Sequence, residues 1–186
     1  ILRKEFKHLE DLVKTAGMLI PRIFPDAVWN ESKHKWTFAT GEVLIFNHIK
    51  HVREYDGKFH GHQYAYIGWD ELATWNSVEI YEAMMSTLRT AYQPTKAQPN
   101  LPPLQVRATT NPWGCGRTWV YEYFLEGKKP GEITYNADGT MQRCALFGTV
   151  FQNTYIDEGY IRNYLAQLID PAKKAAWLLG DWEAVD

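Results

Sequence analysis

The stretch Tyr64-Ala-Tyr-Ile-Gly-Trp-Asp-Glu71 decides the fold class, because it is an apolar and aromatic run that stops at two adjacent carboxylates. A run without polar alternation is typical of a central strand covered by helices on both faces. Residues 76–92 follow with apolar side chains at helical spacing, and residues 104–108 read as a second strand beyond a proline-rich connection. Strands that alternate with helices predict an α/β fold with a mainly parallel sheet flanked by helices.

The rest of the chain fits this fold class. The expected elements are a helix from residue 6 that ends at Pro21 and Pro25, a β-hairpin within 28–49 that turns at Thr40-Gly41, a helix after Gly116, a strand over 145–151, and two closing helices near 161–168 and 171–179. The last helix is bounded by Asp170-Pro171 and Gly180, and the two closing helices form a small helical lid.

Composition excludes several classes of protein. The chain has 186 residues, of which 45% are hydrophobic and 23% charged, which suffices for a sizeable core. The formal net charge of -2 argues against a protein that coats nucleic acid through bulk positive charge. No apolar run approaches the roughly 20 residues of a membrane span, and two cysteines are too few for a disulfide framework. These features predict a soluble protein of a reducing cytosol.

Two strand ends carry the candidate chemistry, because ligands of open α/β sheets lie beyond the carboxyl ends of the strands. Asp70 could hold Mg²⁺ while Glu71 orients and deprotonates a water, which is the chemistry of nucleotide hydrolysis. The alternative is an acidic helix N-terminus. Thr109, Thr110 and Asn111 follow the second strand and could sense a phosphate or a water, although Asn-Pro is also a common start of a turn. One intervening helix predicts that the two strand ends lie side by side.

A nucleotide hydrolase of this kind also needs a phosphate-binding loop, Gly-x-x-x-x-Gly-Lys-Ser/Thr. The sequence does not contain one, since Gly-Lys occurs only at Gly57-Lys58 and Gly127-Lys128, and neither pair is followed by Ser or Thr. The chain opens at Ile1-Leu2-Arg3 without an initiator Met, and these residues read as the end of a strand. We therefore expect the loop to lie upstream of Ile1.

These segments resemble the large terminase subunits of tailed bacteriophages, which are ATP-driven motors that package DNA. Five segments carry the resemblance over nearly the whole chain: residues 1–3 as a strand end, 36–46 as a β-hairpin, 64–71 as the Walker B strand, 107–119 as the coupling motif, and 179–182 as the end of the ATPase domain. The coupling segment is the most specific of them. The Asp-Glu pair alone is shared with many helicases.

The resemblance implies an N-terminally truncated P-loop NTPase of the ASCE type. Residues 1–152 would form the incomplete NTPase core, and residues 153–186 the helical lid and the start of a linker to a missing nuclease domain. Asp70 would match the magnesium-associated aspartate and Glu71 the catalytic glutamate. Thr109, Thr110 and Asn111 would couple hydrolysis to movement, and the fragment alone would be inactive.

The resemblance also implies cofactors and partners, namely Mg²⁺ and ATP, double-stranded DNA, a portal protein, a small terminase subunit, and a homo-oligomeric ring in the host cytoplasm that docks transiently on the procapsid portal. No membrane is involved. In a ring, an arginine of the neighbouring subunit can complete the active site. Arg53 is the candidate, with Lys58 as the weaker one, and a solvated surface arginine is the alternative interpretation.

Two other functions remain open at this point. One is a helicase-like DNA translocase, which shares the Asp-Glu strand end. The other is a non-catalytic aromatic-rich binding module, in which the acidic pair only caps a helix. The four histidines between residues 48 and 62 could suggest zinc, but no cysteine or second ligand cluster lies nearby in the sequence, so we do not expect a zinc site.

Overall fold

The computed structural model describes residues 1–96 and 99–184, except for the side chains of residues 164–166. The chain divides into two compact units, which we describe separately. The first unit comprises Ile1–Leu72 and Glu79–Thr109, and the second unit comprises Ala73–Val78 and Thr110–Asp186. Both units are therefore built from segments that are separated along the chain.

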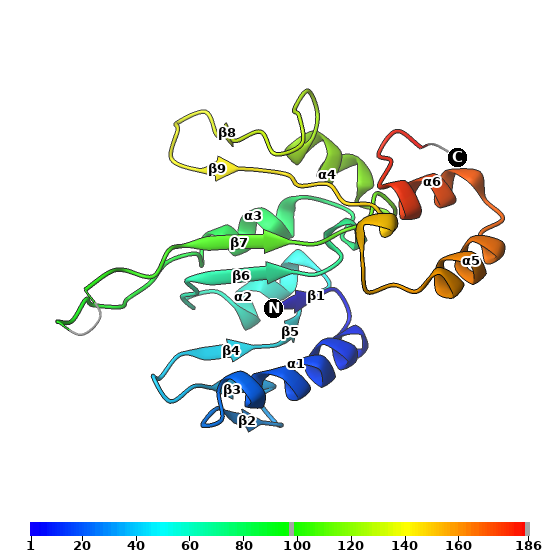
Figure 1. The fold of residues 1–186 in the computed structure, drawn as a ribbon. Helices are drawn as coiled ribbons and strands as arrows, with labels where there is room; N and C mark the ends of the chain where they lie inside the picture. Colours follow the sequence, from blue (N-terminus) through cyan, green and yellow to red (C-terminus); the bar gives the residue numbers. More distant parts are fainter. Residues whose placement is uncertain (97–98, 185–186) are drawn as a thin grey trace. The chain divides into compact units, whose positions relative to one another are not determined.

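A four-stranded parallel sheet lies at the centre of the first unit (Figure 1). Its strand order is β5-β1-β6-β7, with bounds Asn47–His48 for β5, Leu2–Arg3 for β1, Tyr66–Trp69 for β6 and Gln105–Ala108 for β7. Every neighbouring pair is parallel, and Trp69 lies opposite Ala108 at the carboxyl ends of β6 and β7. The predicted α/β class with a parallel sheet is confirmed, as are the two predicted strands and their adjacency.

The interior position of β6 follows from its side chains. Ile67, Gly68 and Trp69 are buried, whereas Tyr66 at the start of the strand is exposed. A Cβ at Gly68 would lie 2.6 Å from Cδ1 of Ile1, so a larger residue at this position would require the Ile1 side chain to move. Helical segments cover the sheet: the 3-10 helix η1 (Phe6–Leu9) packs on β1 and β5, and α3 (Glu79–Met85) places Tyr81 5.7 Å from Trp69 between ring centroids.

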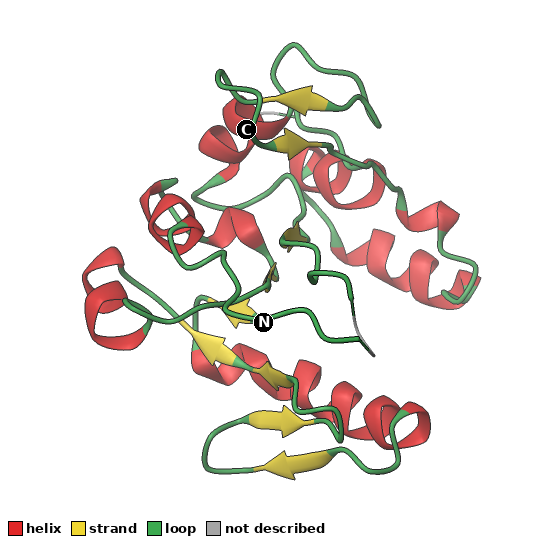
Figure 2. Cartoon of the chain, turned by 90° about the vertical axis from the view of Figure 1, so that its left-hand side faces the viewer, coloured by secondary structure: helices red, strands yellow, loops and turns green. Residues whose placement is uncertain are grey.

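A three-stranded antiparallel meander forms the other half of the first unit's core. It consists of β2 (Val28–Asn30), β3 (Lys35–Thr37) and β4 (Val43–Ile45), and it lies beside α1 (Glu10–Ile23) (Figure 2). Leu9, Trp36 and Phe46 form the buried cluster between helix and strands. The predicted hairpin turn is confirmed, since the Phe38 N–H donates to the Glu42 carbonyl at 2.9 Å and Gly41 has a φ of +97°. The strand β2 was not predicted.

Two helix ends differ from the prediction. Pro21 lies inside α1 and does not end it, because a proline in the last turn removes only its own backbone hydrogen bond and the helix runs on to Ile23. The helix predicted to reach residue 92 ends at Met85. The hydroxyl of Thr87 donates back to the Met84 carbonyl at 2.7 Å, and the Thr87 carbonyl accepts from Tyr64 N–H at 2.8 Å, which takes the backbone out of the helix.

The second unit is built mainly from helices. Its elements are α4 (Arg117–Phe124), the hairpin β8 (Thr134–Tyr135) and β9 (Gln142–Arg143), the 3-10 helix η4 (Val150–Gln152), α5 (Glu158–Gln167) and α6 (Pro171–Leu179). The predicted ends of α6 are confirmed: Asp170 Oδ1 accepts from the N–H groups of Ala172 and Lys173, and Gly180 ends the helix at a φ of +68°.

The predicted strand over 145–151 is wrong. Residues 145–149 have no regular secondary structure, and Leu146 and Phe147 are 81% and 45% exposed, so these two side chains do not enter the core. Thr149 and Gln152 instead form a capping box that starts η4. The hairpin β8-β9 was not predicted. Within the described part of the chain, no helix combines the length and the apolar character needed to cross a membrane.

Candidate functional site

The candidate site lies in the first unit, where the chain leaves β6 between its two neighbouring strands. The N–H of Asp70 donates to the Leu2 carbonyl on β1 at 3.0 Å. On the other side, the N–H of Thr109 donates to the Trp69 carbonyl at 2.9 Å, and the Leu72 N–H donates to the Thr109 carbonyl at 2.9 Å. The backbone around the acidic pair is therefore held from both sides.

One arginine contacts both carboxylates of the pair. Arg3, the last residue of β1, places Nε 2.6 Å and Nη2 2.5 Å from Oδ2 of Asp70, and its Nη1 lies 2.7 Å from Oε2 of Glu71. The side chains of Arg3 and Asp70 are 18% and 22% exposed, and that of Glu71 is 47% exposed. The three charged groups form a partly buried ion-pair cluster with a formal charge of -1.

Thr109 holds the second oxygen of Asp70. Its hydroxyl donates to Asp70 Oδ1 at 2.5 Å, while Arg3 takes Oδ2. Both oxygens of this carboxylate therefore have partners within the protein. We name Arg3, Asp70, Glu71 and Thr109 the strand-end cluster.

The backbone of Glu71 explains how two adjacent side chains reach the same guanidinium. Successive side chains of an extended strand point to opposite faces. Glu71 has a φ of +57°, in the left-handed region that residues with a side chain rarely adopt. This turn breaks the alternation of the strand, so that the carboxylates of Asp70 and Glu71 both contact Arg3.

Thr110 and Asn111 belong to the second unit. The Thr110 hydroxyl oxygen accepts from the N–H of Ala73 at 3.0 Å, and the hydroxyl donates to the Asn111 carbonyl at 3.0 Å. The side chain of Asn111 is exposed. Of the three residues predicted to couple hydrolysis to movement, Thr109 contacts the acidic pair, and Thr110 instead binds the segment that begins at Ala73.

The glycine-rich loop before α4 is docked on the same segment of the second unit, 73–78. The N–H of Gly116 donates to the Ala73 carbonyl at 2.8 Å, and the indole N–H of Trp119 donates to the Trp75 carbonyl at 2.7 Å. A Cβ on Gly116 would lie 1.8 Å from the Trp75 carbonyl oxygen, so only glycine fits there. This close approach was not predicted from the sequence.

The two candidates for a trans-acting cation lie on neighbouring helices of the first unit, η2 (Val52–Glu54) and α2 (Tyr55–Lys58). Arg53 is exposed. Lys58 places Nζ 2.6 Å from Glu54 Oε2 and 3.3 Å from His48 Nε2. The hydrogen bond from Lys58 lowers the pKa of Glu54, while burial and the charge of Lys58 lower the pKa of His48. Lys58 is thus engaged inside its own unit.

The oxygen atoms of the strand-end cluster are of the kind that Mg²⁺ prefers, namely carboxylate and hydroxyl oxygens. The donor set therefore fits Mg²⁺ in type, while the guanidinium of Arg3 lies against the carboxylate oxygens that such an ion would use. Among the described residues, no group of three or more His, Cys, Asp or Glu side chains is placed to hold a metal ion.

Arg3 is the member of the cluster that the sequence analysis missed as a functional residue. It lies 67 positions before Asp70, and the parallel pairing of β1 with β6 brings the two together. The available signal was an arginine at the end of a short apolar strand, because the ends of adjacent parallel strands meet at one edge of a sheet.

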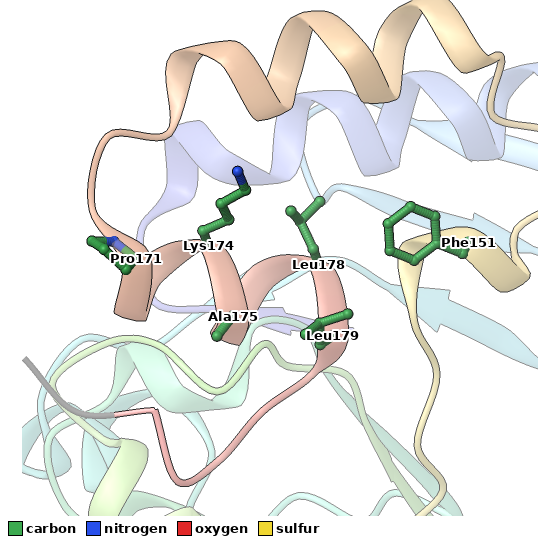
Figure 3. A pocket seen from close by; sticks show the side chains of 6 residues that line it. All are labelled: Phe151, Pro171, Lys174, Ala175, Leu178 and Leu179. Carbon is green, nitrogen blue, oxygen red and sulfur yellow. The ribbon is translucent and has the colours of Figure 1, made fainter.

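A pocket of about 340 Å³ lies on the second unit (Figure 3). Side chains of α6 face Phe151 of η4 across it, and its lining is formed by Phe151, Pro171, Lys174, Ala175, Leu178 and Leu179. Only Lys174 contributes a polar side chain, so its amine is the one titratable or nucleophilic group among these lining residues.

The chain was compared with protein-family models, with curated proteins and with solved structures, and none of them matches it.

Proposed function

We propose that the chain is the ATPase part of a viral DNA-packaging motor, which hydrolyses ATP with Mg²⁺ and moves double-stranded DNA into a procapsid. The observation that carries the proposal is the place of Asp70 and Glu71 at the carboxyl end of an interior parallel strand, with Thr109 of the adjacent strand bonded to Asp70. This is the position at which α/β sheets of the nucleotide-binding kind place their chemistry.

Each residue has a role that its position supports. Asp70 would associate with the metal ion, and Glu71, the more exposed carboxylate, would orient a water and take its proton. When bound, Mg²⁺ would neutralise the negative charge that develops on the transferred phosphate. Thr109 would link the acidic pair to the end of β7, because it binds Asp70 through its side chain and Leu72 through its carbonyl.

The backbone of Glu71 supports a chemical role for its carboxylate. A residue with a Cβ in the left-handed region costs about 1 kcal/mol relative to glycine, and such strain is concentrated at functional sites. Glycine or asparagine would adopt this conformation at lower cost, so a glutamate at this position favours a requirement for its side chain.

The same proposal covers the partners and the place of action. We propose that the motor works as a homo-oligomeric ring on a portal protein in the host cytoplasm and receives DNA with the help of a small terminase subunit. Arg53 is the proposed trans-acting arginine, since it is exposed while Lys58 is paired with Glu54. The coupling role of Thr110 and Asn111 is supported by the bond from Ala73 N–H to Thr110, which fixes the start of the segment after the acidic pair.

The test is ATP hydrolysis by the full-length gene product, because the 186 residues contain no Gly-x-x-x-x-Gly-Lys-Ser/Thr sequence. We expect Glu71→Gln to lower kcat by about 10²-fold or more while ATP binding is largely retained, since a general base contributes about 10²–10⁴-fold. The matched control is Glu79→Gln at the exposed start of α3, which should turn over normally. Normal turnover of Glu71→Gln would refute the role of Glu71.

A second candidate function is favoured by one observation, the pairing of both carboxylates with Arg3. An ion pair of this kind also occurs as a purely structural element, which is what a non-catalytic binding module would need. Under that function, Asp70→Ala lowers the stability and leaves the ATPase rate of the gene product unchanged. A helicase-like translocase is distinguished from a packaging motor by strand-unwinding activity on duplex DNA.

A further inference from the structure

Arg3 occupies the position where the acidic pair would receive a cation. Three of its nitrogen atoms lie within 2.7 Å of carboxylate oxygens of Asp70 and Glu71. A guanidinium group has hydrogen-bond donors and no acceptor, so each contact uses a lone pair that a metal ion would need. The remaining oxygen of Asp70, Oδ1, accepts the hydroxyl hydrogen of Thr109.

We propose that Arg3 keeps the acidic pair closed to divalent cations, and that a cation binds Asp70 only after the Arg3 side chain has moved away. The inference rests on the proposed function, because it regulates the site that the function assigns to the metal ion. Arg3 is a positioning residue in this scheme, since it acts through the two carboxylates.

The distances and the charge of Arg3 indicate that a metal ion and the guanidinium group cannot occupy the site at the same time. Mg²⁺ binds carboxylate oxygens at about 2.0–2.1 Å and accepts only near-octahedral arrangements. Arg3 holds two nitrogen atoms within 2.6 Å of the same oxygen, Asp70 Oδ2, so a metal ion there would lie against a positive guanidinium. The repulsion between the two cations is strong in this cluster, because the side chains of Arg3 and Asp70 are mostly shielded from water.

The cluster opens when the Arg3 side chain changes its rotamer, because this withdraws all three nitrogen atoms from the carboxylate oxygens. The groups that face Arg3 are Asp70 and Glu71, with Thr109 on the far oxygen of Asp70. Substitution of Arg3 therefore tests the closure directly.

The test uses the 186-residue protein and manganese(II) chloride as the probe, with free Mn²⁺ followed by electron paramagnetic resonance. We expect Arg3→Gln to bind Mn²⁺ at least about tenfold more tightly than the original protein, because removal of an adjacent unit charge favours the incoming cation. The double variant Arg3→Gln/Asp70→Asn should lose this gain. The matched control, Arg22→Gln on the exposed end of α1, should bind Mn²⁺ like the original protein.

Arg3→Lys covers the case in which Arg3→Gln fails to fold. Lysine keeps the charge but offers one nitrogen atom in place of the three that contact the carboxylates, so we expect a gain of about threefold, between the original protein and Arg3→Gln. Circular dichroism confirms the fold of each variant before the titration.

The Mn²⁺ affinities of the variants distinguish a failure of the closing role of Arg3 from a failure of the proposed function. Equal Mn²⁺ affinities of the original protein, Arg3→Gln and Arg3→Lys, combined with weaker binding by Asp70→Asn, would overturn the closing role of Arg3 and leave the metal role of Asp70 intact. If Asp70→Asn changes Mn²⁺ binding in neither background, Asp70 is not a metal ligand, which overturns both the inference and the metal assignment within the proposed function.

Discussion

Thr109 at the end of β7 donates its hydroxyl hydrogen to Oδ1 of Asp70 at the end of β6, across 2.5 Å. The two residues are 39 positions apart in the sequence, and the parallel pairing of their strands brings them together. This bond joins the acidic pair to β7, the strand that Thr110 and Asn111 follow in the sequence.

Loss of the hydroxyl should weaken this connection without changing the shape of the side chain. We expect Thr109→Val to lower the free energy of unfolding by up to about 1 kcal/mol, because Asp70 loses one of its partners at a partly exposed site. Thr109→Ser keeps the hydroxyl and should remain close to the original protein. Urea unfolding of the two variants and of Thr118→Val, an exposed threonine of α4, measures the effect. Equal stability of Thr109→Val and Thr109→Ser would mean that the bond contributes nothing.

The left-handed backbone of Glu71 predicts an unusual order of stability between two substitutions. Glu71→Gly and Glu71→Ala both remove the contact with Arg3, but only glycine adopts a φ of +57° without strain. Glu71→Gly should therefore be more stable than Glu71→Ala by about 1 kcal/mol, which is the reverse of the usual order in a regular helix. Thermal unfolding of the two proteins gives the difference. Greater stability of the alanine variant would show that residue 71 is not held in the left-handed region.

Two glycine-to-alanine substitutions should have opposite effects. A Cβ at Gly116 would collide with the backbone oxygen of Trp75, so Gly116→Ala should destabilise the protein by about 3 kcal/mol or more. A Cβ at Gly17 of α1 has no heavy atom within 4 Å, so Gly17→Ala should stabilise it by about 0.5–1 kcal/mol through helix propensity. Denaturant titration of both variants checks the pair. A tolerated Gly116→Ala would contradict the docking of the loop on the segment 73–78.

His48 should make the protein less stable as the pH falls below neutral. Burial first, and then the charge of Lys58, lower the pKa of this imidazole below 6.5, so the folded state resists a proton that the unfolded chain accepts. The contribution is fully present above pH 6.5 and decreases as the pH falls from 6.5 toward the lowered pKa. His48→Gln should therefore flatten the curve of unfolding free energy against pH between 7 and 5.

Other groups also change the unfolding free energy with pH, so the measured quantity is the difference between the original protein and His48→Gln. Burial lowers the pKa of the α-amino group of Ile1 to about 6, which gives a change of the same sign between pH 6 and 8 in both proteins. The lowered pKa values of the carboxyls of Glu5, Glu42, Glu54 and Asp138 place their titration below pH 4.5. An unchanged slope in His48→Gln between pH 5 and 7 would contradict the prediction.

The sequence predicted those parts of the fold that local patterns determine. The apolar run before Asp70 identified the interior strand, and Asp170 and Gly180 marked the ends of α6 because capping depends on the residues themselves. The run over 145–151 has the same apolar character as a strand, but strands form only where a neighbour offers hydrogen bonds. Nothing in the run itself reveals whether such a neighbour exists.

The candidate site was predicted only in part for a similar reason. Asp70 and Thr109 were found because each follows an apolar strand, and adjacent parallel strands end together. The contact of Arg3 with both carboxylates depends on a strand pairing over 67 positions and on the φ of Glu71. Neither the pairing nor this backbone angle can be read from the local sequence around Arg3 or Glu71. Tertiary contacts of this kind are visible only once the sheet order is known.

The short segment Ala73–Val78 has a consequence for anyone who wishes to divide this protein. It belongs to the second unit although residues of the first unit precede and follow it, so the polypeptide crosses between the units three times. A polypeptide that starts at Thr110 would lack the carbonyl groups of Ala73 and Trp75, to which Gly116 and Trp119 donate. No single cut of the chain therefore yields two intact halves.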